Sequence, residues 1–191
     1  CIQWIRDWRE ENGPGCNLIV GISGGVDSLV AAELCVEAVG ADKVLGVIMP
    51  NYKQDDIDVA YDICQHVLGI DYLTINVGSA YDDIIDQIDA AFNVTDQTLI
   101  NLAPRLRMTT LYGVSQSHNG RVVNTCNLSE DYIGYSTRYG DAAGDFSPLA
   151  QFTKSEVKRI GYYLGLPKKY IEKTPSDGLC GKSDEDSFGF T

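Results

Sequence analysis

The sequence predicts an α/β fold built on a single doubly wound parallel sheet with helices on both faces. Three observations favour this fold. Four short apolar runs have the length and β-branched content of buried strands, the segments between them repeat apolar residues at helical spacing, and a glycine- and serine-rich break follows the first run. Because strands that alternate with helices form right-handed crossovers, the strands are expected to be parallel.

The predicted strands follow one another along the first two thirds of the chain. Each is a short apolar run bounded by glycine, proline or polar residues, and Pro50 closes the second. The strands are expected over residues 17–22, 44–49, 72–77 and 121–125.

The predicted helices lie around and between these strands. The amphipathic opening segment ends near Gly13, Gly40 stops the next helix, and Pro104 is expected either to split the longest helix or to mark its entry. The helices are expected up to residue 12 and over residues 29–39, 55–68, 80–92, 98–118 and 154–164. Beyond Asp141 the chain is rich in loops, and residues 174–191 are expected to form a mobile loop.

The composition argues against several classes of protein. A net charge of −12, a pI near 4.4 and no basic stripe make a nucleic-acid partner unexpected. No apolar run approaches the ~20 residues of a membrane helix and no signal-peptide pattern opens the chain, so we expect a cytoplasmic protein with no membrane partner.

The six cysteines lack metal-ligand spacing and are expected to be free thiols. Because the chain starts at Cys1, a few leading residues are expected to be missing.

The segment between the first strand and the next helix has the features of a phosphate-binding loop. This phosphate loop consists of Gly21, Ile22, Ser23, Gly24, Gly25, Val26, Asp27 and Ser28. Its free amides point outward beside the positive end of the helix, and the glycines let the backbone approach a phosphate closely. No lysine stands where the Walker A loop requires one. The carboxylate of Asp27 fits such a loop if it holds a Mg²⁺ ion that bridges the polyphosphate.

Ligands of parallel α/β sheets bind at the carboxyl ends of the strands, beside a topological switch point. That rule predicts that residues 23–28, 50–54 and 125–130 meet at one edge of the sheet. A tight turn capped by serine is the structural alternative for the phosphate loop.

Two groups of motifs resemble known families. The string Ser23-Gly24-Gly25-Val26-Asp27-Ser28 resembles the pyrophosphate loop of N-type ATP pyrophosphatases, which cleave ATP between its α and β phosphates. The downstream motifs resemble those of ammonia-dependent NAD synthetases, and the similarity extends over about residues 17–190. They are Asn101-Leu-Ala-Pro-Arg-Leu-Arg-Met108, Thr110-Leu-Tyr112, Val123-Asn-Thr-Cys-Asn-Leu-Ser-Glu130, Gly134-Tyr-Ser-Thr-Arg-Tyr-Gly-Asp141, Gly144-Asp145, Pro148-Leu149, Lys154, Lys173-Thr-Pro-Ser176 and Asp184-Glu-Asp186.

The resemblance implies a fold like that of the adenine-nucleotide alpha hydrolases and a two-step activity. In the first step the nicotinate carboxylate of nicotinic acid adenine dinucleotide (deamido-NAD) attacks the α-phosphorus of ATP and pyrophosphate leaves. In the second step ammonia displaces AMP to give NAD. Mg²⁺ is the implied cofactor, with ATP as co-substrate and free ammonia as the nitrogen source. A homodimer is also implied, and helix 98–118 is the candidate interface.

The resemblance also implies roles for individual residues. The magnesium ligands match Asp27 and Glu130. Further ATP contacts match Gln54, Thr125, Lys154 and Ser176. The deamido-NAD contacts match Arg105, Arg138 and Asp145, although Arg138 stands where the family usually has lysine.

Asp141 and Asp145 are expected to be the catalytic residues. Two carboxylates beside an electrophilic anhydride attract ammonium and accept its proton. The alternative is a turn stabilised by hydrogen bonds from aspartate side chains.

Two other functions stay open at this point. One is a GMP-synthetase-like ATP pyrophosphatase, and the other is a non-catalytic nucleotide-binding module of the same fold, which would not need Asp27 and Glu130 together. Release of pyrophosphate separates an enzyme from such a module.

Residues 1–191 are expected to form a single domain. Because family members usually run further, this domain is expected to lack a C-terminal tail.

Overall fold

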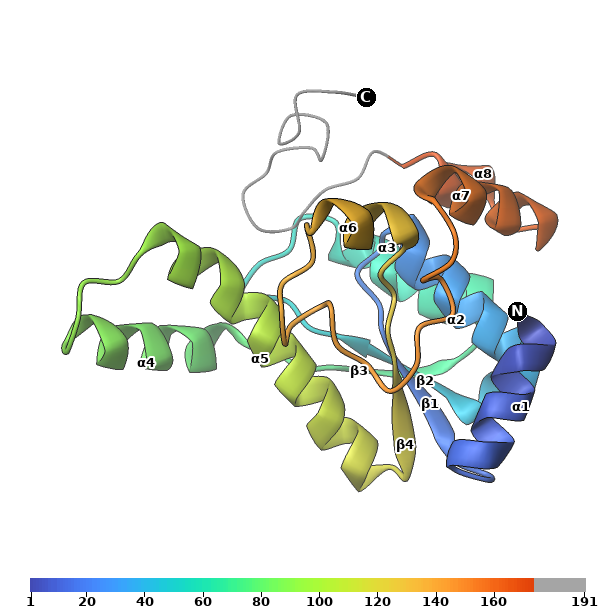
Figure 1. The fold of residues 1–191 in the computed structure, drawn as a ribbon, viewed down its shortest axis with the longest axis horizontal. Coiled ribbons are helices and arrows are strands. Elements are labelled where there is room, and N and C mark those ends of the chain that lie inside the picture. The colour runs from blue at the N-terminus through green and yellow to red at the C-terminus, as the bar shows by residue number, and fades with distance from the viewer. Residues whose placement is uncertain (174–191) are drawn as a thin grey trace.

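A four-stranded parallel sheet forms the centre of the molecule in the computed structural model, which describes residues 1–173 (Figure 1). The strands lie in the order β3-β2-β1-β4. They are β1 (Asn17–Gly21), β2 (Val44–Ile48), β3 (Asp71–Thr74) and β4 (Gly120–Val123). All three strand pairs are parallel, so the predicted fold class is confirmed. The loop expected over residues 174–191 lies outside the described residues.

The order of the strands creates a switch point beside β1. From β1 the chain runs outward through β2 to β3, and it then returns to place β4 on the other side of β1. Ile19 of β1 is therefore paired with Leu45 of β2 on one side and with Val122 of β4 on the other. β1 and β4 are neighbours in the sheet, so their carboxyl ends lie side by side at the switch point, where the ligand-binding crevice of this class of fold is expected.

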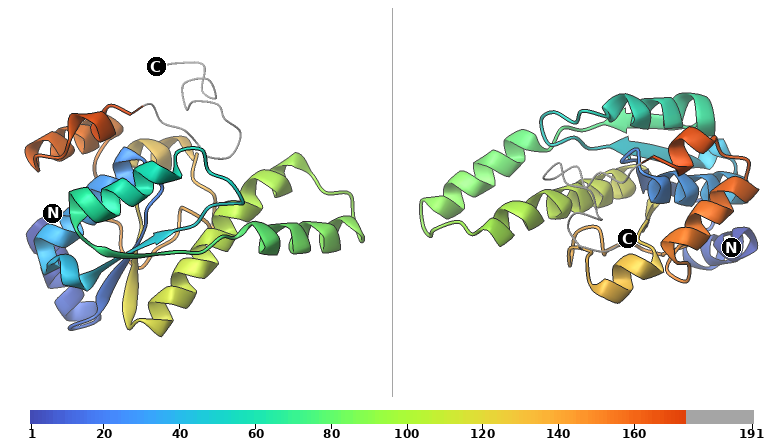
Figure 2. Two further views of the ribbon diagram at one scale, coloured as in Figure 1. Left: turned by 180° about the vertical axis from the view of Figure 1, so that it is seen from behind. Right: turned by 90° about the horizontal axis from the view of Figure 1, so that it is seen from above.

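Helices cover both faces of the sheet (Figure 2). One face carries α1, α2, α7 and α8, and α5 covers the opposite face. The helices are α1 (Ile2–Asn12), α2 (Val26–Val39), α3 (Ile57–Asp62), α4 (Gly78–Asp89), α5 (Asp96–Ser117), α6 (Leu128–Ile133), α7 (Lys154–Tyr163) and α8 (Lys168–Ile171), with a 3₁₀ turn η1 (Ala41–Lys43) and a π-helical turn η2 (Ile63–Leu68).

The two faces of β1 build two separate apolar cores. Leu18 and Val20 pack with the α2 side, whereas Ile19 packs with Met108 and Leu111 of α5. Successive side chains of a strand point to opposite faces, so an uninterrupted apolar strand is the pattern expected when both faces are covered. This double burial fixes β1, and with it the loop that follows its carboxyl end.

Helix α5 runs without interruption through Pro104, whereas the sequence predicted a split or an entry at this residue. Thr95 caps the helix nine residues earlier, because its side chain accepts a hydrogen bond from Thr98 N at 3.2 Å. A proline inside a helix removes one backbone hydrogen bond at a cost of about 3 kcal/mol. Burial of Pro104 against Gly140, where an added Cβ would lie 2.9 Å from the proline ring, offsets part of that cost.

Smaller differences from the prediction occur at the edges of elements. The helix expected over 55–68 consists of α3 and the wider η2, which Gly69 ends with a φ of +61°. The strand expected over residues 72–77 is β3, which ends earlier, at Thr74. The helix expected from residue 80 begins at Gly78. The short helices α6 and α8 were not predicted, because they contain 6 and 4 residues and show no helical period.

Two further properties concern the described part of the chain. No helix there has the length and apolar character needed to cross a bilayer. The described cysteines are free, as predicted, and all of them except Cys1 are buried.

Candidate active site

The phosphate loop leaves β1 at Gly21 and enters α2 at Val26. Gly24 has a φ of +86°, which is left-handed backbone that favours glycine. The Ser23 hydroxyl accepts a hydrogen bond from Gly25 N at 3.2 Å and lies 3.2 Å from the Ser28 hydroxyl, which in turn donates to Gly25 O at 3.0 Å. Both serine hydroxyls therefore hold the shape of the loop, in which Gly24 is buried and Ser23 is exposed.

The predicted Gln54 contact lies at this loop. Its side-chain nitrogen donates to Ser23 O at 3.0 Å and to Asp56 Oδ1 at 3.1 Å. Ile22 and Val26 are buried in the core, so they hold the loop to the sheet through their side chains and expose only backbone to a ligand.

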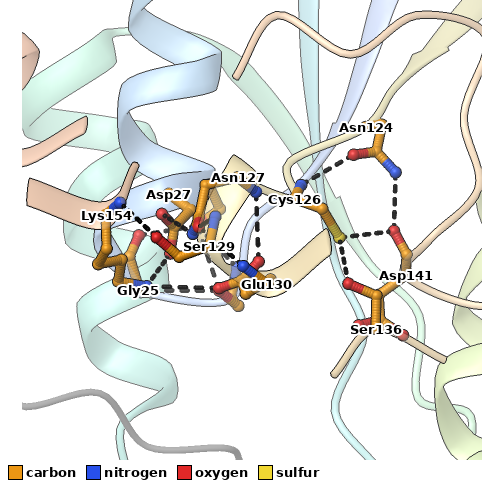
Figure 3. Close-up of polar contacts among 12 residues, drawn as sticks. Gly25, Asp27, Asn124, Cys126, Asn127, Ser129, Glu130, Ser136, Asp141 and Lys154 are labelled. Carbon is orange, nitrogen blue, oxygen red and sulfur yellow. Dashed lines mark hydrogen bonds and ion pairs between the residues drawn. The ribbon is translucent and has the colours of Figure 1, made fainter. Parts of the chain in front are cut away.

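Three charged residues from distant parts of the sequence meet beside the loop (Figure 3). Asp27 lies in the first turn of α2, Glu130 in the first turn of α6, and Lys154 opens α7. The Lys154 ammonium contacts the Asp27 carboxylate and lies 3.5 Å from Glu130 Oε1. Their side chains are only 15%, 26% and 27% exposed, so the cluster is largely shielded from water.

Asn127 connects the two carboxylates of this cluster. Its Oδ1 accepts from Ser129 N and Glu130 N at 2.9 and 3.2 Å, and Glu130 Oε2 accepts from Asn127 N at 3.3 Å, which completes a capping box at α6. Its Nδ2 donates to Asp27 Oδ1 at 3.0 Å. One asparagine thus fixes the start of α6 and the orientation of Asp27. The Asn-x-x-Glu spacing was visible in the sequence, but its contact with Asp27 was not.

The electrostatics of the cluster favour a divalent cation. Burial, together with the charge of nearby Asp27, raises the pKa of Glu130 to about 7, against the lowering effect of Lys154. Mg²⁺ prefers hard oxygen donors and usually takes one or two carboxylates plus substrate phosphates. Asp27 and Glu130 fit that donor set, and in this structure the ammonium group of Lys154 supplies their positive counter-charge.

A cavity of about 230 Å³ opens at the carboxyl ends of the strands, next to α5. Its polar lining includes Arg107, Thr125 and Asp141, and its apolar lining includes Met49, Met108 and Leu111. Arg107 donates its Nε hydrogen to Met49 O at 3.0 Å, which ties α5 to the end of β2.

Asp141 is the ionisable acid of this cavity. Its Oδ1 accepts from Thr137 N at 2.9 Å. Burial raises its pKa, while the Thr137 hydrogen bonds and the charge of Arg107 act in the opposite direction. The loop that carries Asp141 is held by Asn124, whose side-chain nitrogen donates to Asp141 O and Ala143 O at 2.8 Å each. The sequence predicted neither Arg107 nor Asn124 as site residues.

Asp145 does not lie with Asp141. Its Oδ2 accepts from Val122 N at 2.7 Å, its Oδ1 lies 3.4 Å from the Tyr112 hydroxyl, and it lines a separate hollow beside α5. The two predicted binding arginines are brought together, since Arg105 Nε donates to Arg138 O at 3.2 Å and both are exposed. The predicted ATP contact Ser176 lies outside the described residues.

The fold and the site together define the class of protein. A glycine-rich loop without the Walker lysine lies at the switch point of a parallel sheet, and two carboxylates suited to a divalent cation flank it. These features indicate an α/β enzyme that binds a nucleoside triphosphate.

Comparisons with known proteins identify the family. The family described as NAD synthase matches residues 1–191. An NH₃-dependent NAD⁺ synthetase from Thermococcus kodakarensis is 41% identical over 189 residues, which cover 98% of this chain and 73% of that protein. The enzyme of the same name from Carboxydothermus hydrogenoformans is 41% identical over 195 residues, which cover 100% and 79%.

Solved structures agree with this result. The structure of NMN synthetase from Francisella tularensis superposes with a TM-score of 0.88 at 36% identity and covers 100% of this chain and 79% of that one. The NH₃-dependent NAD synthetase from Campylobacter jejuni gives a TM-score of 0.81 at 33% identity and covers 90% and 73%.

The chain belongs to the NAD synthase family. Its activity is ammonia-dependent NAD synthesis, in which a ligase that uses ATP forms a C–N bond. The predicted family, fold and activity are therefore confirmed, and neither a GMP-synthetase-like activity nor a non-catalytic module is supported.

Proposed function

We propose that the phosphate loop holds the polyphosphate of ATP and that Asp27 and Glu130 hold Mg²⁺ beside it. The observation that carries this proposal is the meeting of Asp27, Glu130 and Lys154, from three different elements, beside the phosphate loop and the start of α2. A carboxylate pair at an anion-binding loop is unfavourable unless a cation joins the two. Mg²⁺ bound there supplies positive charge that stabilises the departing pyrophosphate.

Lys154 is the positively charged residue that lies at these two carboxylates. Its long stem would let the ammonium reach a phosphate of the substrate if Asp27 and Glu130 held Mg²⁺. The loop amides, Lys154 and the start of α2 together favour the charge that develops on pyrophosphate as the adenylate forms.

The cavity beside the loop suits the second step, the attack of ammonia. Thr125 and Asp141 line it at the carboxyl end of β4. We assign Asp141 to ammonium binding and proton acceptance, because a carboxylate with a raised pKa is a better proton acceptor than an ordinary one. Arg105, Arg138 and Asp145 lie on the α5 side, and we assign them to the dinucleotide.

The test is a complete reaction with Mg·ATP, ammonium and deamido-NAD, followed by measurement of NAD, AMP and pyrophosphate. Asp27→Asn and Glu130→Gln should each lower kcat/KM by about 100-fold or more, because each leaves the phosphate charge without its metal anchor. Asp71→Asn, at the exposed start of β3, is the matched control. Release of ADP and orthophosphate by the wild-type protein would contradict the proposed cleavage site.

The substrate on the acceptor side needs a separate measurement. The structure with a TM-score of 0.88 is an NMN synthetase, whereas the similar sequences are NAD⁺ synthetases. We propose the dinucleotide as the acceptor of this chain, in line with those sequences. Nicotinate mononucleotide offered in place of deamido-NAD tests the proposal, since a higher kcat/KM for the mononucleotide would reverse the assignment.

We also propose that the chain forms a homodimer through the α4–α5 arm, which projects from the rest of the molecule in Figure 1. Leu99 and Ile100 of α5 are 40% and 46% exposed, and Phe92 at the tip is 74% exposed. An exposed apolar surface of this kind marks interaction sites.

We also propose a cytoplasmic location, and the buried free thiols support it.

A further inference from the structure

Lys173 lies over the phosphate loop, although it follows α8 at the far end of the described chain. Its Nζ lies 3.4 Å from Gly24 O. A Cβ built on Gly24 would stand 3.6 Å from the same nitrogen, so the ammonium group is in contact with the bend of the loop itself. In the sequence Lys173 opens the motif Lys173-Thr-Pro-Ser176, but nothing there predicts its contact with the loop.

Asp56 holds Lys173 in this position. The Lys173 ammonium forms an ion pair with the Asp56 carboxylate, and the two side chains are 23% and 28% exposed. The other oxygen of Asp56 accepts from Gln54, which also donates to Ser23 O. One continuous hydrogen-bonded network beside the phosphate loop therefore consists of Gln54, Asp56 and Lys173.

The two lysines at the loop approach it from different elements. Lys154 opens α7 and contacts Asp27, which lies inside α2. Lys173 follows α8 and contacts the bend at Gly24, before α2 begins. A polyphosphate on the loop amides would thus have one ammonium group near the metal ligands and another near the bend.

We propose that Lys173 is a second phosphate-binding lysine, whose ammonium exchanges the Asp56 carboxylate for a phosphoryl oxygen when ATP or pyrophosphate binds. The inference rests on the proposed function, because it needs the polyphosphate to occupy the loop. The exchange is favourable for two reasons. A terminal phosphoryl group carries more charge than a carboxylate, and Asp56 keeps its hydrogen bond from Gln54 and its access to water after the lysine leaves. An ion pair that is partly open to water costs little to break.

Lys173→Met tests the proposal, since methionine keeps most of the aliphatic stem and removes the charge. Equilibrium binding is measured for inorganic pyrophosphate, Mg·ATP and AMP. The variant should bind pyrophosphate and ATP about tenfold more weakly, with AMP unchanged, because one charged hydrogen bond is lost. Lys169→Met is the matched control, because Lys169 pairs with Asp62 on the surface and does not contact the loop. Unchanged ATP and pyrophosphate binding, or equal weakening for AMP, would overturn the proposal.

Asp56→Asn separates an exchange from a fixed ion pair. If Lys173 leaves Asp56 for the phosphate, removing the carboxylate charge should tighten pyrophosphate binding several-fold. Weaker binding in Asp56→Asn, to the same extent as in Lys173→Met, would show instead that the pair stays closed in the complex.

Lys154→Met shows which proposal has failed. If it weakens ATP binding and Lys173→Met does not, the phosphate loop site holds and only the role of Lys173 is wrong. If neither variant weakens it, the polyphosphate does not lie on this loop, and the proposed function fails with the inference.

Discussion

Asn127 fixes both carboxylates of the proposed magnesium site, although it is not itself charged. Its carbonyl oxygen caps α6, the helix that carries Glu130, and its amide nitrogen donates to Asp27 Oδ1. It is fully buried. A small change at this residue is therefore expected to alter both the stability and the metal dependence of the enzyme.

Asn127→Ala should lower the free energy of unfolding by about 2 kcal/mol, from the lost cap and the lost hydrogen bond to a charged group. It should also raise the Mg²⁺ concentration needed for half-maximal activity, because Asp27 is no longer oriented. Denaturant unfolding and a magnesium titration measure the two effects. Thr95→Ala removes the cap of α5 far from the site, so it should lower stability alone. A normal magnesium titration in Asn127→Ala would contradict the positioning role.

Asp141→Asn should raise the KM for ammonium at least tenfold and leave the affinity for Mg·ATP unchanged, because the amide can neither attract ammonium nor accept its proton. Asp145→Asn should leave the KM for ammonium near the wild-type value, since Asp145 points to Val122 N and Tyr112 instead. Steady-state kinetics at fixed ATP distinguish the two. Equal effects on ammonium from both variants would restore a shared ammonium site.

The pH dependence follows from the raised pKa of Asp141. A raised pKa means that the folded protein holds this proton at a pH where an ordinary aspartate, with a pKa near 3.9, has lost it. Activity should therefore fall on the acid side at a higher pH than an ordinary aspartate gives. Removing the charge of Arg107 should move this acid limb further upward, since that charge lowers the pKa. A profile of kcat/KM for ammonium in Arg107→Met, at saturating ATP, measures the shift, and an unchanged acid limb would count against Asp141 as the acceptor.

At the residue scale, sequence patterns predict the chemistry of a continuous segment better than they predict contacts between residues far apart in the chain. The phosphate loop was predictable because strand, glycines, serines and helix follow one another without a gap. The resemblance to a family supplied Glu130 and Lys154. The contacts of Arg107 with Met49 and of Lys173 with Gly24 were not predictable, because they join residues 58 and 149 positions apart.

Among the elements, α5 has the largest number of roles. Its buried residues Met108 and Leu111 complete one core, its Arg107 and Pro104 line the cavity, and its first turns carry exposed apolar side chains. The sequence predicted its length and apolar face but not its continuity at Pro104. Local propensity disfavours proline inside a helix, and the packing of Gly140 that compensates for it belongs to a segment 36 residues away.

The outer end of α5 carries the proposed dimer interface. Leu99→Asp and Ile100→Asp together should convert the proposed homodimer to a monomer, because two charges would be buried in an apolar interface. Sedimentation equilibrium at micromolar protein measures the mass. Gln116→Asp, on the last turn of the same helix, is the control and should stay dimeric. A wild-type protein that sediments only as a monomer would rule out the dimer.

For the whole molecule, the strand order β3-β2-β1-β4 is the feature that brings the site together. The sequence predicted parallel strands and the connections that should meet, but a linear pattern does not state on which side of β1 the last strand lies. The resulting crevice gathers residues from α2, α6 and α7 within a chain whose net charge is −12. That overall charge repels a polyphosphate, so binding has to depend on local positive charge, part of which the proposed function assigns to Mg²⁺ at Asp27 and Glu130.

This dependence can be measured as ligand-linked stability. A ligand present at about 100 times its Kd stabilises the folded state by about 2.7 kcal/mol, which for a chain of this size raises Tm by roughly 5–10 °C. Mg²⁺ with pyrophosphate should produce a rise of that order, because the metal cancels the repulsion between Asp27, Glu130 and the anion. Pyrophosphate with EDTA should produce little or none. The same comparison in Asp27→Asn separates a metal held by the site from a metal that only accompanies the anion in solution. If the rise persists in that variant, or survives EDTA, then Lys154 and the loop amides suffice for the anion, and the carboxylates have another role.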